Sequence, residues 1–435
     1  MSAFNLPPVS RRSLLIAGLA GASATALPGL ASASSASEWT GPYAVSSLPT
    51  VKPIWSHKAY QAFGVCTHPN FGNSGYKYTD QWMAALAGTG ASYFRGMYAH
   101  KLGATTTTIK RARAHGLKWG MTVFPEDWGL SDAELATRVK HIAQNAADVC
   151  LYIEGMNEPN HERDGSRAPA DWPQRTVAKQ KVIWQTVKND SRLSHVKVLG
   201  PSLQAIEATE SQYKTLGDAG IAQYMDYAAM HRYSGGRYPN HLIDERLAWV
   251  KRHWGGKPTW ITEAGYTNAL ASSGGHSPVP EDVSAVYGPS QVLEAVDRGC
   301  NVCWYQLLDG VDAGAKNVTE DNFGMFATKS GMAPPWRAKP VVGVMKSFLA
   351  GLKDAGPAYS PPTMGLKVAS SVADVTTTVL GKRNGSVTLY IRRATNCWDP
   401  LKQQRISVKA VPVTVQTAKG SRTFTVDHKV RSVLL

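Results

Sequence analysis

Two glutamates end apolar runs, in positions where their carboxyl groups could work as a pair. Residues 151–160 read LYIEGMNEPN, so Glu158 follows a predicted buried strand. Residues 258–268 read PTWITEAGYTN, and Glu263 ends a run of the same kind. Two carboxyl groups about 5–5.5 Å apart can carry out retaining hydrolysis of a glycosidic bond. One protonates the leaving oxygen, the other attacks the anomeric carbon, and a wider gap would favour an inverting enzyme.

The elements that must position this pair alternate regularly along the chain. Predicted strands cover 62–67, 92–97, 118–124, 149–155, 197–202, 227–233, 258–264 and 302–308. Helical patterns cover 79–88, 104–115, 131–146, 174–189, 208–218, 241–253, 282–298 and 338–350. Eight strand–helix units predict an α/β fold, a (β/α)₈ TIM barrel. The alternative, a doubly wound open sheet, usually has a glycine-rich phosphate loop after its first strand, and HPNFGNSGY at 68–76 is not one.

Polar and aromatic residues at the carboxyl ends of these strands are the candidate site residues, because the loops of such a barrel converge there. The candidates for substrate binding, besides the two catalytic glutamates, are Arg95, Asn157, His231, Tyr233, His68 and Trp304. Structural explanations compete with three of these assignments. Arg95 could pair with Glu154 inside the barrel, His231 could be a core histidine with satisfied hydrogen bonds, and Trp304 could pack in the core.

The order and spacing of these residues resemble the clan A glycoside hydrolases. NEP at 157–159 and ITEAG at 261–265 match the glutamate motifs that end the fourth and seventh strands in that clan. Arg95 in YFRG and HRY at 231–233 extend the match, which covers roughly 58–350. FGVCTHPNFGNSGY and IEGMNEPN are most similar to the family 39-like group, which includes enzymes that act on bacterial exopolysaccharides.

The resemblance and the chemistry imply a role for each side chain. Glu158 would be the general acid and then the base, and Glu263 would be the ionised nucleophile. Arg95 and Tyr233 would support the charge of Glu263, and Asn157 would bind the sugar 2-hydroxyl.

Composition restricts the class of protein and its partners. A chain of 435 residues, 43% of them hydrophobic and 18% charged, predicts a large well-packed domain and a smaller one. The formal net charge is +15, but lysine and arginine are scattered with no run of five, which argues against nucleic acid as a partner. Two explanations remain for the charge, a solvated basic surface and an acidic polymer as partner or substrate.

The cysteines do not predict a metal site. Cys300-x-x-Cys303 has no second pair and no histidine at zinc spacing, so we expect neither a metal nor a cofactor. Cys66, Cys150 and Cys303 lie on predicted strands, and buried free thiols are the default for all five cysteines. A disulfide is the alternative, because export leads to an oxidising compartment.

The two ends of the chain differ from the barrel. Residues 1–36 contain SRRSLL, an Ala/Gly-rich apolar run and Ala31-Ser32-Ala33, which together predict a Tat-type export signal and a periplasmic or extracellular protein. No other segment reaches 18 consecutive apolar residues, so we expect no membrane span in the mature protein. Residues 37–57 are Ser/Pro-rich and predict a linker, followed by the catalytic barrel at 58–352.

The C-terminal segment predicts an accessory domain that resembles a β-sandwich. From residue 357 to 435 helical periodicity disappears, and β-branched runs flank Asn384-Gly385, a strong hairpin signal. Taken together, the sequence predicts an exported, endo-acting retaining glycoside hydrolase that cleaves a polysaccharide. The alternatives are a non-catalytic carbohydrate-binding barrel and a transglycosylase that uses the same residues.

Overall fold

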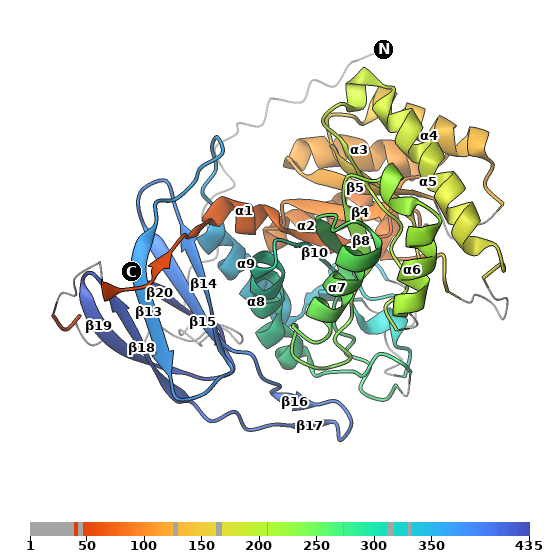
Figure 1. Cartoon of the computed structure of the whole chain (residues 1–435). Helices are drawn as coiled ribbons and strands as arrows, with labels where there is room; N and C mark the ends of the chain where they lie inside the picture. The colour runs from red at the N-terminus through yellow and green to blue at the C-terminus, as the bar shows by residue number, and fades with distance from the viewer. Residues whose placement is uncertain are drawn as a thin grey trace, which may run out of the picture.

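The computed structural model describes most of the chain as a helix-covered barrel with a β domain beside it (Figure 1). The described residues are 39–41, 47–124, 129–161, 168–206, 208–272, 274–310, 317–328 and 332–435. The predicted export signal lies outside them. Within these ranges, the helices are all too short or too polar to cross a bilayer.

Eight parallel strands form the barrel, and each of them coincides with a predicted strand. They are β3 (Phe63–Cys66), β4 (Tyr93–Met97), β5 (Lys118–Phe124), β6 (Cys150–Met156), β7 (Lys197–Leu199), β8 (Ala228–His231), β9 (Thr259–Ala264) and β10 (Asn301–Trp304). Their order in the sheet is β7-β6-β5-β4-β3-β10-β9-β8. A bridge between Leu199 and Tyr227 brings the two edge strands together, so the barrel is nearly closed and the predicted (β/α)₈ fold is confirmed.

Helices cover the outside of this barrel, as the apolar periodicity predicted. They are α2 (Thr79–Thr89), α3 (Gly103–His115), α4 (Asp132–Asn145), α5 (Trp172–Lys188), α6 (Glu210–Asp218), α7 (Ile243–His253), α8 (Glu281–Asp297) and α9 (Pro340–Leu352). A short α1 (Ser56–Gln61) precedes the first barrel strand. Gly116 ends α3 with φ 66°, a left-handed backbone that glycine adopts without strain.

Side chains fill the inside of the barrel, so that it is a packed core and not a pore. Cys66, Tyr93, Tyr152 and Cys303 are among the residues packed there. All five cysteines are buried and unbridged, as expected for free thiols in a packed interior.

The C-terminal domain is a sandwich of two four-stranded sheets. Its long strands are β13 (Met364–Ser370), β14 (Val375–Gly381), β15 (Val387–Arg393), β18 (Val411–Thr417), β19 (Gly420–Val426) and β20 (Arg431–Leu434). Short pairs lie outside the two sheets: β11 (Phe326–Ala327) with β12 (Arg337–Ala338), and β16 (Trp398–Asp399) with β17 (Gln404–Arg405). The β14–β15 hairpin turns at Gly385, as the Asn384-Gly385 signal predicted. Side chains from both sheets form a separate apolar core.

Two short strands of the segment predicted as a linker, 37–57, belong instead to the β domain, and its last two residues begin α1. Its strand β1 (Thr50–Val51) pairs with β13, and β2 (Ile54–Trp55) pairs with β14. The prediction failed because strands of two residues carry no alternation pattern, and their partners lie about three hundred residues further along the chain. Strands from both ends of the folded chain therefore build the same domain. Strand β1 belongs to one of its two sheets and β2 to the other.

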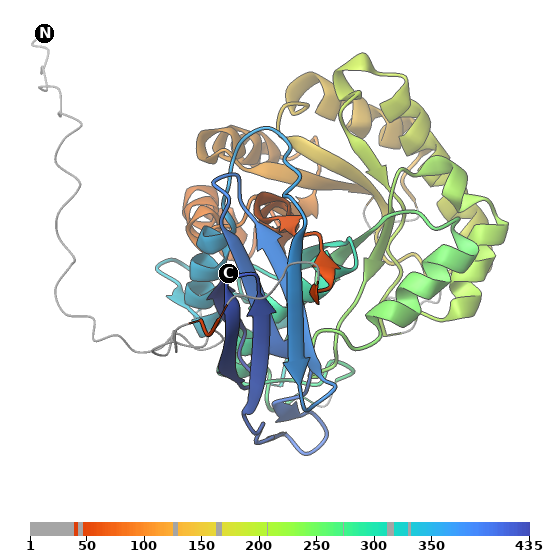
Figure 2. The same cartoon turned by 60° about the vertical axis from the view of Figure 1, so that its left-hand side comes forward.

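The β domain packs on the side of the barrel formed by α8 and α9 (Figures 1 and 2). Arg392 of β15 crosses this interface with its side chain only 1% exposed. It donates from Nε to Glu294 Oε1 at 2.9 Å and from Nη2 to Asp297 Oδ2 at 2.6 Å, both on α8. A third donor, Nη1, bonds the Thr378 hydroxyl at 2.8 Å. The buried charge is thus fully paired across the domain boundary.

We expect Arg392→Met to lower the free energy of unfolding by about 3 kcal/mol, because it removes a buried cation from Glu294 Oε1 and Asp297, while Glu294 Oε2 keeps Arg298 at 2.6 Å. Arg405→Met is the matched control. Arg405 also pairs with α8, at Asp282, but its side chain is 60% exposed, so its loss should cost about 1 kcal/mol or less. Urea titrations of both variants measure the difference. Equal losses would mean that burial of the Arg392 network contributes nothing to stability.

Candidate active site

The guanidinium of Arg95, on β4, is the centre of a polar cluster at the carboxyl end of the barrel. Its Nε donates to Glu154 Oε2 at 2.6 Å, and its Nη1 donates to Glu263 Oε1 at 2.6 Å. Its Nη2 donates to Asn157 Oδ1 at 2.7 Å. The structural explanation for Arg95, an ion pair with Glu154, is therefore confirmed, and its contact with substrate stays a prediction. Arg95 pairs with Glu154 inside the barrel, and it also positions the ends of β6 and β9.

Glu263, on β9, is held as an anion. Its side chain is 11% exposed, and the Tyr233 hydroxyl donates to its Oε2 at 2.7 Å. Burial alone would raise the pKa of this carboxyl group. Electrostatic interactions with His231 and Arg95, together with hydrogen bonds from Tyr233 and Arg95, outweigh burial and hold the pKa below its usual value. An ionised carboxylate with fixed donors is the state that a nucleophile requires.

Glu158 projects from the turn that follows β6. Its φ of 47° lies in the left-handed region that favours glycine, so a glutamate there is strained. The turn is fixed because the Glu158 backbone N–H donates to Ser202 O at 2.8 Å. Strain that persists in a fixed turn is typical of residues kept for their side chain.

His231, on β8, connects the two glutamates. Its Nδ1 lies 2.7 Å from Glu158 Oε1 and 3.4 Å from Glu263 Oε2. The hydrogen bond between Nδ1 and Glu158 Oε1 places one proton between them, on the imidazole when Glu158 is ionised and on Glu158 when it acts as an acid. Oxygen atoms of the two carboxylates and a nitrogen of His231 lie within 4.8 Å of one another.

This separation decides which chemistry the pair can perform. An upper limit of 4.8 Å between one oxygen of each carboxyl group fits the spacing of about 5–5.5 Å in retaining glycoside hydrolysis better than the wider spacing of an inverting mechanism, which places a water between its carboxyl groups. The same three residues have the donor atoms of a metal site. The Arg95 guanidinium, 2.6 Å from Glu263, makes a second cation there unfavourable.

His68, after β3, lies beside the cluster. Its ring stacks on Phe71 with centroids 4.6 Å apart and meets the edge of Tyr305 at 5.6 Å. Burial lowers its pKa to about 4, so the ring is neutral at neutral pH. Its Nε2 is buried and has no hydrogen-bond partner within the described ranges, so a contact of His68 with substrate stays a prediction.

Trp304, the remaining predicted binding residue, does not reach the site. It is 1% exposed and packs in the layer between strands and helices, 6.0 Å from the Tyr266 ring. Strand side chains alternate between faces, and the preceding residue, Cys303, is the one that points into the barrel. The structure therefore supports core packing for Trp304 instead of a sugar platform.

An aromatic rim surrounds Tyr233, and sequence reasoning missed most of it. The rings of His276, Phe323 and Tyr305 lie 4.6, 5.5 and 6.1 Å from the Tyr233 ring. Tyr305 follows a predicted strand end, so its position could be predicted. His276 and Phe323 come from irregular loops after β9 and β10, where no periodic pattern indicates which side chains turn inward.

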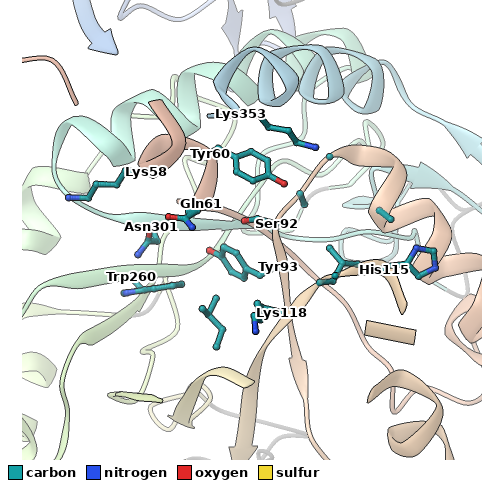
Figure 3. Close-up of a pocket in the computed structure, with 16 residues that line it drawn as sticks. Lys58, Tyr60, Gln61, Ser92, Tyr93, His115, Lys118, Trp260, Asn301 and Lys353 are labelled. Atoms are coloured by element: carbon teal, nitrogen blue, oxygen red, sulfur yellow. The ribbon is translucent and has the colours of Figure 1, made fainter. Parts of the chain in front are cut away.

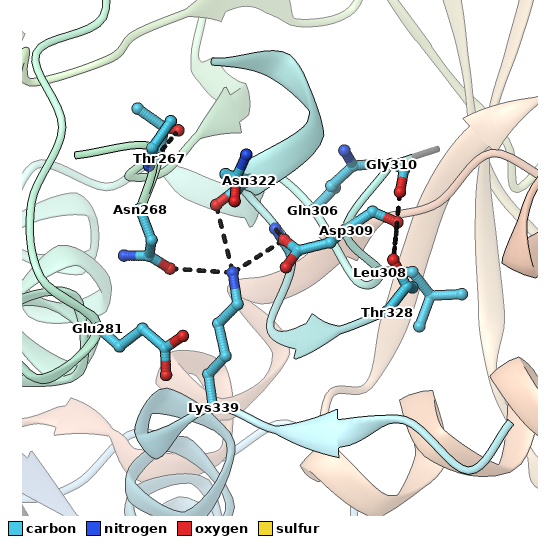
Figure 4. A network of polar contacts seen from close by, with 12 residues as sticks. Thr267, Asn268, Glu281, Gln306, Leu308, Asp309, Gly310, Asn322, Thr328 and Lys339 are labelled. Carbon is cyan, nitrogen blue, oxygen red and sulfur yellow. Dashed lines mark hydrogen bonds and ion pairs between the residues drawn. The ribbon is translucent and has the colours of Figure 1, made fainter. Parts of the chain in front are cut away.

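A buried lysine anchors the loop after β10 (Figure 4). Lys339 is 1% exposed, and its Nζ donates to Asn268 Oδ1 at 3.0 Å, Asp309 Oδ1 at 2.8 Å and Asn322 O at 3.2 Å. These contacts join the loops after β9 and β10 to the start of α9. They fix the short helix Glu320–Asn322 and so position Glu320 at the mouth.

Glu320 is a third carboxyl group, and its pKa depends on the charges of Glu158 and Glu263. Burial and the negative charges of Glu263 and Glu158 raise the pKa of Glu320 to about 7. Because 64% of this side chain remains exposed to water, we assign more of the shift to the two charges than to burial. His276 Nε2 lies 3.9 Å from Glu320 Oε1, which links this residue to the aromatic rim.

We expect Glu263→Gln to lower the pKa of Glu320 from about 7 towards the ordinary glutamate value of about 4.3, because it removes one of the two charges that oppose ionisation. Carboxyl ¹³C NMR titration of glutamate-labelled protein measures this, with the signal assigned through Glu320→Gln. Signals of distant glutamates such as Glu245 serve as the control. An unchanged value would assign the shift to burial alone.

Comparison with known proteins supports the barrel fold but does not assign an activity to this protein. No protein-family model matches the sequence, and no curated protein sequence matches it. Among solved structures, a β-glucosidase from Exiguobacterium marinum is similar with a TM-score of 0.51 and 12% identity, over 68% of this chain and 99% of its own. A family 1 β-glucosidase from Thermotoga maritima is similar with a TM-score of 0.51 and 12% identity, over 69% and 99%.

Proposed function

We propose that this protein is a retaining glycoside hydrolase that cleaves a polysaccharide by double displacement. The observation that carries the proposal is the pair Glu158 and Glu263, with oxygen atoms within 4.8 Å at the carboxyl end of a (β/α)₈ barrel. The different surroundings of the two carboxyl groups support different roles. Glu263 has an arginine and a tyrosine that stabilise its charge, whereas Glu158 contacts the His231 imidazole.

The chemistry follows from these positions in two balanced steps. In the first, a Glu263 oxygen attacks the anomeric carbon while the bond to the leaving oxygen breaks and Glu158 gives that oxygen its proton. In the second, water attacks the anomeric carbon, passes its proton to Glu158 and releases the Glu263 carboxylate. Asn157, held by Arg95 at 2.7 Å, is placed to bind the 2-hydroxyl of the same sugar.

The substrate class rests on three further observations. The solved structures with the same fold include β-glucosidases, and the motifs around 62–76 and 153–160 resemble the family 39-like group. In the aromatic rim, the partly exposed rings of His276 and Tyr305 offer surface to sugars, and the buried Phe323 packs behind them. The predicted export signal agrees with a substrate outside the cytoplasm. We therefore propose that the substrate is an exopolysaccharide and that the enzyme cleaves its internal glycosidic bonds.

Covalent labelling tests the proposal directly. Incubation with 2,4-dinitrophenyl 2-deoxy-2-fluoro glycosides of several sugars should release dinitrophenol in a single burst, because fluorine slows the second step. Peptide mass spectrometry should then find the glycosyl ester on Glu263. Fragments released from purified exopolysaccharides should keep the configuration of the cleaved bond. Inverted products, or a label on another residue, would reject the retaining mechanism.

A further inference from the structure

A second hollow lies at the opposite end of the barrel from the two glutamates (Figure 3). Its volume is about 550 Å³, within the range of small-ligand sites. Residues at or just before the starts of barrel strands form its walls, among them Gln61, Ser92, Lys118, Leu151, Trp260 and Asn301. Parallel strands all begin at this end, so the hollow is on the amino-terminal face. The chemistry proposed above makes no use of it.

Three lysines supply the charge of the side chains that line this hollow. Lys58, Lys118, Lys353 and His115 line it, and none of its 16 lining residues is acidic. Within the described part of the chain these four side chains form no ion pair. Lys118 donates to the Asp148 carbonyl at 2.6 Å, and Lys353 lies over the Tyr60 ring at 5.3 Å. Several cations around one concavity attract an anion.

The other lining groups are those that bind sugars. Trp260 and Tyr60 offer aromatic surface, and the amides of Gln61 and Asn301 offer both donors and acceptors. Trp260 is held in place by Tyr152, whose ring lies 4.8 Å away. The Nε1 atom of Trp260 is buried and has no hydrogen-bond partner among the described residues. A buried donor without a partner costs free energy, so an acceptor that reached it would stabilise the complex.

We propose that this basic pocket binds an acidic saccharide, a short stretch of sugar units that carry carboxylate groups. The carboxylates pair with Lys58 and Lys353 at the rim, sugar faces contact Tyr60 and Trp260, and a sugar oxygen accepts from Trp260 Nε1. The pocket is then a second, non-catalytic site that retains an acidic polymer on the enzyme. This also gives a specific use to part of the net charge of +15.

Calorimetric titration of the full chain tests this site without using catalysis. The probes are trigalacturonate and triglucuronate, with neutral galactotriose for comparison. We expect at least one acidic probe to bind, with an affinity that falls as salt rises, and the neutral probe to bind at least about 10-fold more weakly. Lys58→Gln with Lys353→Gln should weaken the acidic probe about 10-fold or more.

The control variant is Lys140→Gln with Lys251→Gln. It lowers the net charge by the same amount, at exposed positions on α4 and α7. It should bind the acidic probe as the unmodified chain does. The four lysines are exposed, so melting temperatures should not change and lost binding cannot be attributed to unfolding. No binding of either acidic probe overturns the proposal, as does equal weakening in both double variants. Sulfate that competes as well as the trisaccharides would reduce the pocket to a simple anion site and also overturn it.

Failure of this experiment and failure of the proposed hydrolase activity can be told apart. The calorimetric titration measures only the binding of saccharides to the protein. The covalent label measures only the nucleophilic reaction of Glu263. Hydrolysis of small aryl glycosides should be the same in the Lys58/Lys353 double variant as in the unmodified chain. Only the binding of acidic chains should change.

Discussion

Glu263→Gln is expected to lower kcat by about 10⁴-fold or more on every substrate, activated aryl glycosides included. The amide has nearly the shape of the carboxylate but cannot form the glycosyl ester. Leaving-group quality should not matter, because no substrate avoids the attack on the anomeric carbon. Steady-state rates on a series of aryl glycosides measure the loss, and the 2-fluoro reagent should no longer label the protein.

The fold should survive this change, so that the loss can be assigned to chemistry. Arg95 keeps its bonds to Glu154 and Asn157, at 2.6 and 2.7 Å, when residue 263 becomes an amide. Glu320→Gln is the matched control, a carboxylate at the same mouth that the proposed steps do not use. It should keep most of the activity at a pH well below 7, where most of Glu320 is protonated. If Glu263→Gln keeps more than about a hundredth of the activity, another residue is the nucleophile.

The framework of the site could be predicted from sequence because it depends on local patterns. Buried parallel strands are continuous apolar runs, and the residue that ends each run must lie at one rim of the barrel. That rule alone brings Glu158, Glu263, Arg95 and His231 together. It also required no knowledge of loop structure, which is why the two glutamates could be paired although they are far apart in the sequence.

Trp304 and the 37–57 segment show the limits of those patterns. Trp304 ends a strand but points away from the barrel interior, since alternation had already placed Cys303 inside. Counting in steps of two from Cys303 would have selected Tyr305, which does belong to the rim. Strands β1 and β2 are too short to show alternation, and only their distant partners define them.

The loop residues show a different limit. Glu320 reaches the mouth because Lys339 ties two loops together through three polar contacts (Figure 4). Each contact joins residues between 17 and 71 positions apart along the chain. No periodicity predicts such contacts, so the third carboxylate could be found only in the structure.

Replacement of Glu158 should produce a loss that depends on the leaving group. Glu158→Gln and Glu158→Ala remove the proton donor, so hydrolysis of the polymer and of aryl glycosides with poor leaving groups should fall by about 10²–10⁴-fold. Dinitrophenyl glycosides need no protonation to leave, so their first step should change little. The second step, which lacks its general base, then becomes rate-limiting, and a burst of dinitrophenol should precede slow turnover. Rates across a series of leaving groups measure this contrast with Glu263→Gln.

Azide rescue distinguishes the roles of the two carboxylates, because the anomeric configuration of the glycosyl azide depends on which one is missing. In Glu158→Ala the small anion enters the space of the lost carboxyl group and attacks the glycosyl ester on Glu263, so a β-glycoside should yield a β-glycosyl azide with restored turnover. In Glu263→Ala azide replaces the nucleophile instead, and the azide should have the opposite configuration. NMR of the two products identifies the anomers. An inverted azide from Glu158→Ala would exchange the two assignments, because attack on the opposite face means that residue 158 had been the nucleophile.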